Sequence, residues 1–183
     1  MQKIITSNDS CKVLNELIAE GNYDNIFILT DKNTEKHCLP LINKSSLLKN
    51  ARKITIKAND DNKNIESLSH VWAELGNMEA TRHSLLINLG GGMVTDLGGF
   101  AASTFKRGIR FINIPTTLLA MVDASVGGKT GINFNGLKNE IGVFNSADAV
   151  ILDSSFLQTL DSQNIRSGYA EMLKHGLISD NHH

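Results

Sequence analysis

Short apolar runs alternate with longer segments of helical periodicity along the chain. The runs are rich in β-branched residues and occur at 26–29, 54–56, 85–89 and 111–114, with a further run at 149–152. Such runs are typical of buried strands, and helices between them are typical of βαβ units. The pattern therefore predicts an α/β fold with a mostly parallel sheet.

Two of the helical segments have a well-defined apolar face. The first face contains Val13, Leu14, Leu17 and Ile18, and the second contains Ile65, Leu68, Trp72 and Leu75. The second helix is predicted to begin after an Asn64 cap and to end at Gly76. Apolar residues at this spacing usually pack against a sheet, so we assign both faces to the core rather than to a cofactor site.

The composition is that of one globular domain. The chain has 183 residues, of which 41% are hydrophobic and 20% charged, and residues 1–183 contain no repeat or linker that would divide them. This length is enough to bury one core. The formal net charge of −1 gives no reason to expect a nucleic acid or an anionic membrane as a partner.

The expected location is the cytoplasm. No run approaches the ~20 apolar residues of a membrane span, and the first residues have no signal-peptide core. Cys11 and Cys38 lack the spacing of a redox or metal motif and are interpreted as thiols of a reducing compartment.

The last helical segment, 163–178, is followed by residues 179–183, in which we find neither a helix cap nor a closing strand. A complete domain usually ends its last element with one of these signals. We therefore interpret 163–183 as the start of a connection to a further domain, and the chain as truncated.

Three consecutive glycines, Gly90–Gly92, stand between a predicted strand and a predicted helix over 93–104. Glycines at such a turn let backbone N–H groups approach a pyrophosphate at a helix N-terminus, although they also make ordinary tight turns. The fingerprint GxGxxG would follow the first strand, and its sixth position is Thr95 here. Asp31, which ends an earlier strand, is a candidate for the ribose. These features indicate a dinucleotide site of a non-standard kind.

The segment 100–144 combines cations and an acid with many glycines and threonines. Arg107, Lys129 and Lys138 lie in this predicted glycine-rich loop together with Asp123. Any one of the cations could be a solvated surface residue. Their concentration in one segment suits the binding of a phosphate and hydroxyl groups better than it suits packing.

Several motifs in this chain form a recognisable series. They are Gly90–Asp96, Gly98–Phe100, Pro115–Leu119, Ser125–Thr130, Lys138–Asn139 and Ala170–Lys174. In order and spacing they resemble 3-dehydroquinate synthase, and the resemblance covers nearly the whole chain. It implies a Rossmann-like N-terminal α/β domain, and an active site shared with an all-helical C-terminal domain that is absent from this chain.

The resemblance implies NAD as the cofactor and assigns residues to it. Asp31 is expected at the adenosine ribose, and Asp60 with Lys63 at a further nucleotide contact. The remaining nucleotide residues are Gly91, Gly92, Met93, Val94, Asp96, Thr116, Thr117, Leu119, Lys138, Phe156 and Thr159. The family normally has Pro and Gly before a Glu where this chain has Ala58-Asn59-Asp60, so the chain departs from the family pattern at this contact.

The resemblance also assigns the catalytic residues. Asp123 and Lys129 are expected to face both cofactor and substrate, and Asn139 and Lys174 to face the substrate phosphate. Arg107 resembles a family arginine that reaches the phosphate in a neighbouring subunit, which implies a homodimer.

Glu171 corresponds to the one family ligand for zinc, or cobalt, in this half; the other two are histidines of the helical domain. His175 lies four residues later on the same helix face, but the family does not use this position, so we predict that it is not a ligand. His182 and His183 at the chain end are also poor candidates. A catalytic zinc normally has three protein ligands, so the chain by itself is predicted to hold no tight zinc and to be inactive.

The implied reaction converts 3-deoxy-arabino-heptulosonate 7-phosphate to 3-dehydroquinate with loss of phosphate, a lyase step of the shikimate pathway. Three alternatives stay open: another sugar-phosphate cyclase of the deoxy-scyllo-inosose or valiolone synthase type, a metal-dependent polyol dehydrogenase of the glycerol dehydrogenase type, and a silent nucleotide-binding module. Arg107, Lys129 and Lys138 argue against the dehydrogenase, because a phosphate-free substrate has no use for them.

Overall fold

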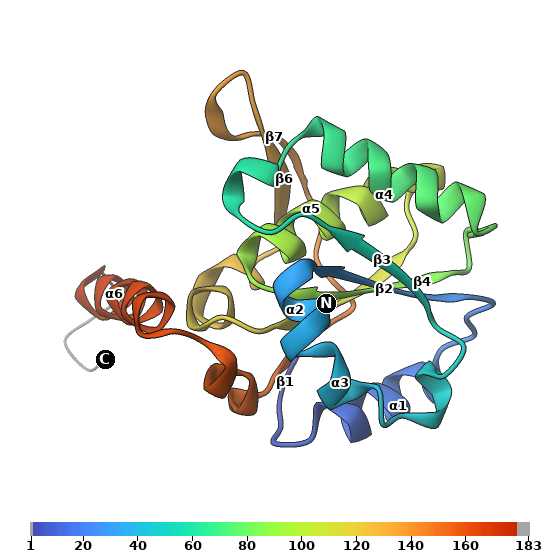
Figure 1. The fold of residues 1–183 in the computed structure, drawn as a ribbon, viewed down its shortest axis with the longest axis horizontal. Coiled ribbons are helices and arrows are strands. Elements are labelled where there is room, and N and C mark those ends of the chain that lie inside the picture. Colours follow the sequence, from blue (N-terminus) through green and yellow to red (C-terminus); the bar gives the residue numbers. More distant parts are fainter. Residues whose placement is uncertain (1, 179–183) are drawn as a thin grey trace.

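The computed structural model describes residues 2–178 and contains a six-stranded parallel sheet with helices on both faces (Figure 1). The strands are β1 (Lys3–Thr6), β2 (Ile26–Asp31), β3 (Arg52–Ile56), β4 (Leu85–Gly90), β5 (Arg110–Pro115) and β8 (Ala149–Leu152). Their order across the sheet is β1-β8-β5-β4-β2-β3. The predicted α/β fold with a mostly parallel sheet is confirmed, and it is Rossmann-like.

Helices cover the sheet in two layers. One face packs against α4 (Ile65–Asn77) and α5 (Gly92–Thr104), and the other against α1 (Ser10–Glu20) and the short α3 (Leu39–Ile42). The alternation of side chains along each strand produces two apolar clusters: Phe27 and Leu29 belong to the first, whereas Ile28 belongs to the second. The core is therefore divided by the sheet, as expected for a buried parallel sheet.

The five predicted strands are present, but β1 and a hairpin were not predicted. The segment taken for a glycine-rich loop contains an antiparallel hairpin of β6 (Lys129–Phe134) and β7 (Leu137–Phe144). Gly131 pairs with Gly142 in its middle. Glycine is rare in strands, which hid the hairpin from a pattern based on β-branched residues. The short edge strand β1 was not predicted either, because neither of its faces is buried.

The predicted helices agree with the structure apart from small differences at their ends. Asn64 caps α4 by accepting a hydrogen bond from the Ser67 backbone N–H at 3.0 Å, but α4 continues one residue beyond Gly76. Ile65 was assigned to the core but is 39% exposed; it is the first residue of α4. The short helix α2 (Lys32–His37) was not predicted, because its sequence has no apolar face.

Short helical turns complete the chain. They are η1 (Ser46–Leu48), η2 (Asp60–Asn62), η3 (Phe105–Arg107), a π-helical turn η4 (Ala120–Ala124) and η5 (Ser154–Thr159). The last helix, α6 (Ser162–Ile178), lies beside the layered core rather than on either face of the sheet (Figure 1). Nothing in residues 2–178 forms a helix both long and apolar enough to cross a membrane. The expectations for residue 1 and for His182 and His183 lie outside the described residues.

The chain leaves the carboxyl ends of β2 and β4 in opposite directions. From β2 it continues to β3 on one side, and from β4 it continues to β5 on the other side. Such a switch of direction leaves a crevice outside the carboxyl ends of the two strands, where open α/β sheets bind ligands. Asp31 and Gly90 are the last residues of these strands, so both predicted nucleotide features border the crevice.

Candidate functional site

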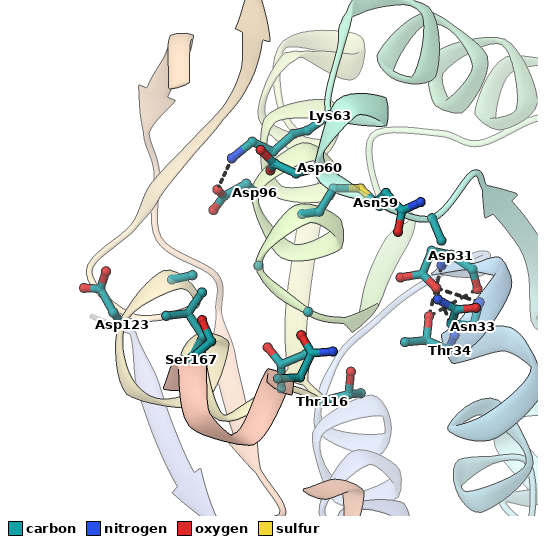
Figure 2. A pocket seen from close by; sticks show the side chains of 18 of the residues that line it. Asp31, Asn33, Thr34, Asn59, Asp60, Lys63, Asp96, Thr116, Asp123 and Ser167 are labelled. Carbon is teal, nitrogen blue, oxygen red and sulfur yellow. Dashed lines mark hydrogen bonds and ion pairs between the residues drawn. The ribbon is translucent and has the colours of Figure 1, made fainter. Parts of the chain in front are cut away.

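A cavity of about 1040 Å³ lies at the carboxyl edge of the sheet. The β2–α2 and β4–α5 turns form its inner end, and the hairpin, η4 and the start of α6 form its outer end. Figure 2 shows Asp31, Asn33 and Thr34 on one side of the cavity and Asp123 and Ser167 on the other. A cavity of this size is large enough to hold more than one small ligand.

The glycine turn places the N-terminus of α5 in the cavity. Gly91 is the N-cap residue, and no side chain caps this helix. The first backbone N–H groups of a helix lack partners within it, and they favour an anion such as a pyrophosphate. A Cβ atom on Gly91 would lie 2.9 Å from Thr117 Cγ2, so a larger residue would crowd this wall of the cavity.

Asp31 ends β2 and caps α2 at the same edge. Its Oδ1 accepts hydrogen bonds from the backbone N–H groups of Asn33 at 2.7 Å and Thr34 at 2.9 Å. The side chain is thereby fixed at the cavity wall (Figure 2). Because both bonds reach Oδ1, the arrangement leaves Oδ2 for a ligand with hydroxyl donors.

Lys63 is a buried cation whose exposed fraction is only 5%. Its Nζ donates to Asp96 Oδ2 at 2.9 Å and also to Asn139 Oδ1 (Figure 2 shows the first bond). Burial raises the pKa of Asp96 above its ordinary value, although the ammonium group of Lys63 opposes this effect. One side chain therefore joins the β3–α4 segment, α5 and β7 across the cavity wall.

Asn133 ties the hairpin to the same segment. Its backbone N–H donates to the Lys63 carbonyl at 2.7 Å, and its Nδ2 donates to the Asp60 carbonyl at 3.2 Å. Its Oδ1 accepts from the Asn139 backbone N–H at 3.0 Å. Asn139 has a φ of 55°, which non-glycine residues rarely adopt. These contacts, with an ion pair of 2.9 Å between Lys138 and Asp60, fix the strained backbone that presents Asn139.

A group of polar side chains lies where η4 meets α6. His175 Nε2 is 3.4 Å from Glu171 Oε1 and 3.7 Å from Asp123 Oδ1. Lys174 Nζ contacts the same Glu171 oxygen. Its hydrogen bond and charge hold the pKa of Glu171 below the ordinary value, and Glu171 in turn raises the pKa of Lys174. An ionised carboxylate beside an imidazole nitrogen is a donor set that suits zinc or cobalt.

The sequence matches one family over most of its length. The sequence model described as 3-dehydroquinate synthase N-terminal matches residues 53–167. The chain is also 55% identical over 178 residues to the 3-dehydroquinate synthase of Parabacteroides distasonis, an alignment that covers 97% of this chain and 50% of that protein. The chain belongs to the 3-dehydroquinate synthase family. It spans about half the length of this relative.

Solved structures of related cyclases share the fold. One is 2-epi-5-epi-valiolone synthase from Streptomyces hygroscopicus subsp. jinggangensis with NAD+ and Zn2+ bound. Its TM-score is 0.84 and its sequence identity is 27%, and the match covers 95% of this chain and 49% of that chain. Another is a 2-deoxy-scyllo-inosose synthase complexed with carbaglucose-6-phosphate, NAD+ and Co2+, with a TM-score of 0.87, 21% identity, and coverage of 97% and 50%. The resemblance to this second structure shows the fold alone.

Most residues assigned through the resemblance to the 3-dehydroquinate synthase family line one cavity. They are Asp31, Asp60, Lys63, Gly91, Gly92, Met93, Asp96, Thr116, Thr117, Leu119, Asp123, Lys129, Asn139 and Thr159. They come from segments far apart in the sequence, which the sheet topology brings to one edge. Glu171 and Lys174 lie beside Asp123 at the outer end of this cavity.

Four assigned residues lie elsewhere. Val94 and Phe156 are fully buried, in the clusters on the two opposite faces of the sheet, so their side chains belong to the core, and the nucleotide contacts expected of them stay predictions. Lys138 is exposed and pairs with Asp60 at the rim. Arg107 lies in η3, beyond the C-terminal end of α5, whereas the helix N-terminus points into the cavity. It does not line this cavity, and its expected action in a neighbouring subunit stays a prediction.

Two contacts of this site could not be derived from the sequence, those of Asn133 and the approach of Asp123 to His175. Asn133 was not singled out within the segment 100–144, and the contacts by which it holds the hairpin in place could not be seen without the strands. His175 was predicted not to be a metal ligand, and this stays a prediction. Its i,i+4 spacing from Glu171 was the available signal, and the approach of Asp123 from η4 was not detectable.

Proposed function

We propose that the chain is the nucleotide-binding half of a 3-dehydroquinate synthase that converts 3-deoxy-arabino-heptulosonate 7-phosphate to 3-dehydroquinate with loss of phosphate. The observation that carries this proposal is that one cavity joins two kinds of site. Its inner end has a glycine turn and a ribose-type acid, and its outer end has Lys129, Asn139 and Asp123, which lies beside Glu171 and His175. A redox nucleotide and a phosphorylated polyol can react with each other only if their binding sites lie close together, as these two ends do.

NAD is assigned to the inner end. The N-terminus of α5 at Gly91 and Gly92 would accept the pyrophosphate, and Asp31 Oδ2 would accept hydrogen bonds from the adenosine ribose. Thr116 and Thr117 follow β5 and would border the nicotinamide end. This assignment uses the crevice at the switch of direction between β2 and β4.

The substrate is assigned to the outer end. Lys129 begins β6 and would face both the substrate and the cofactor, and Asn139 and Lys174 would bind the phosphate. Arg107 of a second copy would reach the same phosphate, which makes the active unit a homodimer. Fixed cations stabilise the charge of a departing phosphate without reorganisation.

Bound NAD supplies a reversible hydride transfer, and a metal ion supplies Lewis-acid polarisation of the oxidised hydroxyl. The chain's residues hold the reacting groups in place. Glu171 would bind the metal, Asp123 would orient a substrate hydroxyl, and the Lys63–Asp96–Asn139 network would keep the hairpin in position. Thr116, which is buried, and the half-buried Thr117 would exclude water from the nicotinamide.

The 183-residue chain itself is proposed to be inactive. It spans half the length of its relative, and α6 exposes Tyr169, Leu173, Leu177 and Ile178, an apolar surface on the outer side of the cavity. Substrate bound beside α6 would remain in contact with water, whereas elimination and ring closure need a substrate held in one orientation.

The proposal is tested on the protein that contains the remaining half. With the heptulosonate phosphate and substoichiometric NAD, the expected result is inorganic phosphate released in excess of NAD, without net NADH. Net NADH formed from a phosphate-free polyol would favour the polyol dehydrogenase. Phosphate released only from another sugar phosphate would favour a different cyclase, and nucleotide binding without turnover would favour a silent module. Phosphate release by the 183-residue chain would contradict its proposed inactivity.

A further inference from the structure

The hairpin of β6 and β7 is irregular where it borders the cavity. Asn133 is the one residue of β6 between two cross-strand pairs, and the three residues 138–140 of β7 lie opposite it. Such a β-bulge interrupts the ladder of backbone hydrogen bonds and changes the direction of the side chains that it carries. Asn139, in the middle of the bulge, has a φ of 55° and lines the cavity. The bulge therefore brings a strand residue to the proposed substrate end.

The side chain of Asn133 replaces a strand partner that the bulge removes. Its Oδ1 accepts a hydrogen bond from the Asn139 backbone N–H at 3.0 Å. The backbone N–H of Asn133 donates to the Lys63 carbonyl at 2.7 Å, and its Nδ2 donates to the Asp60 carbonyl at 3.2 Å. One residue thus joins the bulge to the β3–α4 segment, which carries two of the predicted nucleotide contacts.

The side chain of Asn139 is held by a different residue. Its Oδ1 accepts from the Nζ of Lys63, which is buried and also donates to Asp96. Asn139 Nδ2 donates to no group in residues 2–178. An amide nitrogen carries two donor hydrogens, so Nδ2 can donate to an acceptor such as a phosphate oxygen. Because Asn139 is exposed, the core does not fix its backbone, and the bond to Asn133 has this role.

We infer that Asn133 is a positioning residue, which holds the bulge of β7 and thereby sets Asn139 in the conformation that binds the substrate phosphate. The inference rests on the proposed function, in which Asn139 contacts the phosphate, and deepens it by naming the residue that sets this contact. Asn133 is half-buried and does not line the cavity. Its effect on turnover therefore passes through Asn139.

The first test is a double-mutant cycle in the protein that contains the remaining half, with phosphate release from the heptulosonate phosphate as the readout. Asn133→Ala is expected to lower kcat/KM by ~10-fold, mainly through KM, because a small misplacement of a binding group has effects of at least this size. Asn139→Ala should lower it at least as much. The double variant should be no worse than Asn139→Ala alone, since Asn133 then has nothing to position. Losses that multiply, or parental kcat/KM in Asn133→Ala, would overturn the inference.

Asn133→Asp tests which bond of Asn133 matters. A carboxylate keeps an acceptor for the Asn139 N–H and loses only the Nδ2 donor, so kcat/KM should stay within ~3-fold of the parent. This variant also keeps the inference testable if circular dichroism shows that Asn133→Ala does not fold. A loss in Asn133→Asp as large as that in Asn139→Ala would contradict the inference.

Asn135→Ala is the matched control, because it is an alanine substitution of another asparagine in the same hairpin. Asn135 has a φ of 49° in the turn and does not line the cavity. Alanine should strain this turn and lower the midpoint of thermal unfolding, whereas kcat/KM should be unchanged. An equal loss of kcat/KM in Asn135→Ala would show that any weakening of the hairpin has this effect, and would reject a specific role of Asn133.

A second readout does not depend on turnover. In the 183-residue chain, hydrogen exchange of the Asn139 backbone N–H, followed by NMR, should be at least ~10-fold faster in Asn133→Ala and nearly unchanged in Asn133→Asp. Unchanged exchange in Asn133→Ala, with phosphate release by the longer protein, would overturn the inference and leave the proposed function standing. Faster exchange, with no phosphate release by the longer parent protein, would support the positioning of Asn139 by Asn133 and reject the proposed function.

Discussion

The two ends of the cavity differ in how completely this chain builds them. At the inner end, Asp31 is fixed by the α2 cap and Gly91 by the packed turn between β4 and α5. At the outer end, Asp123 and His175 are half exposed, and α6 presents apolar side chains to solvent. The inner end follows directly from the sheet topology, since strand ends and helix starts are fixed by the core. The outer end depends on elements that pack only at their edges.

The comparison teaches that binding and chemistry have different structural requirements in this fold. A nucleotide cradle needs backbone N–H groups and one acid, which a single sheet supplies. In the proposed function, catalysis on a phosphorylated polyol would need cations and a metal ligand, which the hairpin and α6 would supply. The following predictions test whether the two ends are as separable as this division implies.

The largest effect is expected at the outer end. In the protein with its remaining half, Lys129→Ala should lower turnover by about 10²–10³-fold, because a positioned charge at the departing phosphate is worth roughly that much. The midpoint of thermal unfolding should hardly change, since Lys129 is exposed. Lys106→Ala, which removes an exposed lysine outside the cavity, is the control. Near-normal turnover of Lys129→Ala would refute the assignment of this end.

Arg107 tests whether the outer end is completed by a second copy. Arg107→Ala should lower turnover by up to about 10²-fold in the same protein, through loss of a charged hydrogen bond to phosphate. Mixing this variant with Lys129→Ala should restore part of the activity at mixed dimers. If labelled subunits exchange and activity does not return, Arg107 does not act in a neighbouring site.

Asp31 tests the inner end by itself. Asp31→Asn should weaken NAD binding to the 183-residue chain by ~10-fold, because bonds to a charged acceptor are stronger than bonds to a neutral one. Asparagine also caps helices well, so stability should be kept, whereas Asp31→Ala should lose about 1 kcal/mol as well. Calorimetric titration and chemical unfolding measure the two effects. Unchanged affinity in Asp31→Asn would place the ribose elsewhere.

The chain alone should also bind NAD more weakly than the protein with its remaining half, by a few-fold to ~10-fold. The reason is the incomplete outer end, since a missing contact of ordinary strength is worth about 1 kcal/mol. Parallel titrations give the comparison. Equal affinities would show that the inner end is complete within this chain.

The smallest effect is a pH dependence of stability from Asp153. Burial would raise the pKa of this carboxyl, but hydrogen bonds from Ser155 and Ser10, including one of 2.8 Å from Ser10 Oγ, lower it below 3.8. A depressed pKa contributes stability above the unfolded value, and this contribution disappears as the pH falls through the folded value. Asp153→Asn should cost about 1 kcal/mol at pH 7 and less below about pH 4. Equal losses at both pH values would contradict the shift.

The sequence was sufficient for the elements whose pattern reflects burial. The strand at 85–89 and the helix at 93–104 were predicted because both carry apolar residues into one core. The hairpin was not predicted because β7 is exposed along its length and both strands contain glycine, so no apolar alternation marks it. Because the hairpin was not predicted, Lys129 and Asn139 were assigned to a loop, although both lie in strands.

The site was predicted unevenly for the same reason. Asp31 and Gly91 could be placed because they follow predicted strands directly. Val94 and Phe156 were assigned to the cofactor through the family resemblance, yet the core holds both side chains. The approach of Asp123 to His175 depends on how η4 packs against α6, a long-range contact that no local pattern encodes.

The π-helical turn at Ala120–Ala124 bears on how this site could change over time. A π-turn is equivalent to an α-helix with one inserted residue, and each residue turns the helix by about 100°. Deletion of one residue before Asp123 would restore an α-turn and rotate the carboxylate away from α6, with little damage to the sheet. A single-codon deletion in a lineage would thus be enough to separate this acid from Glu171 and His175, while the fold and the glycine turn persist.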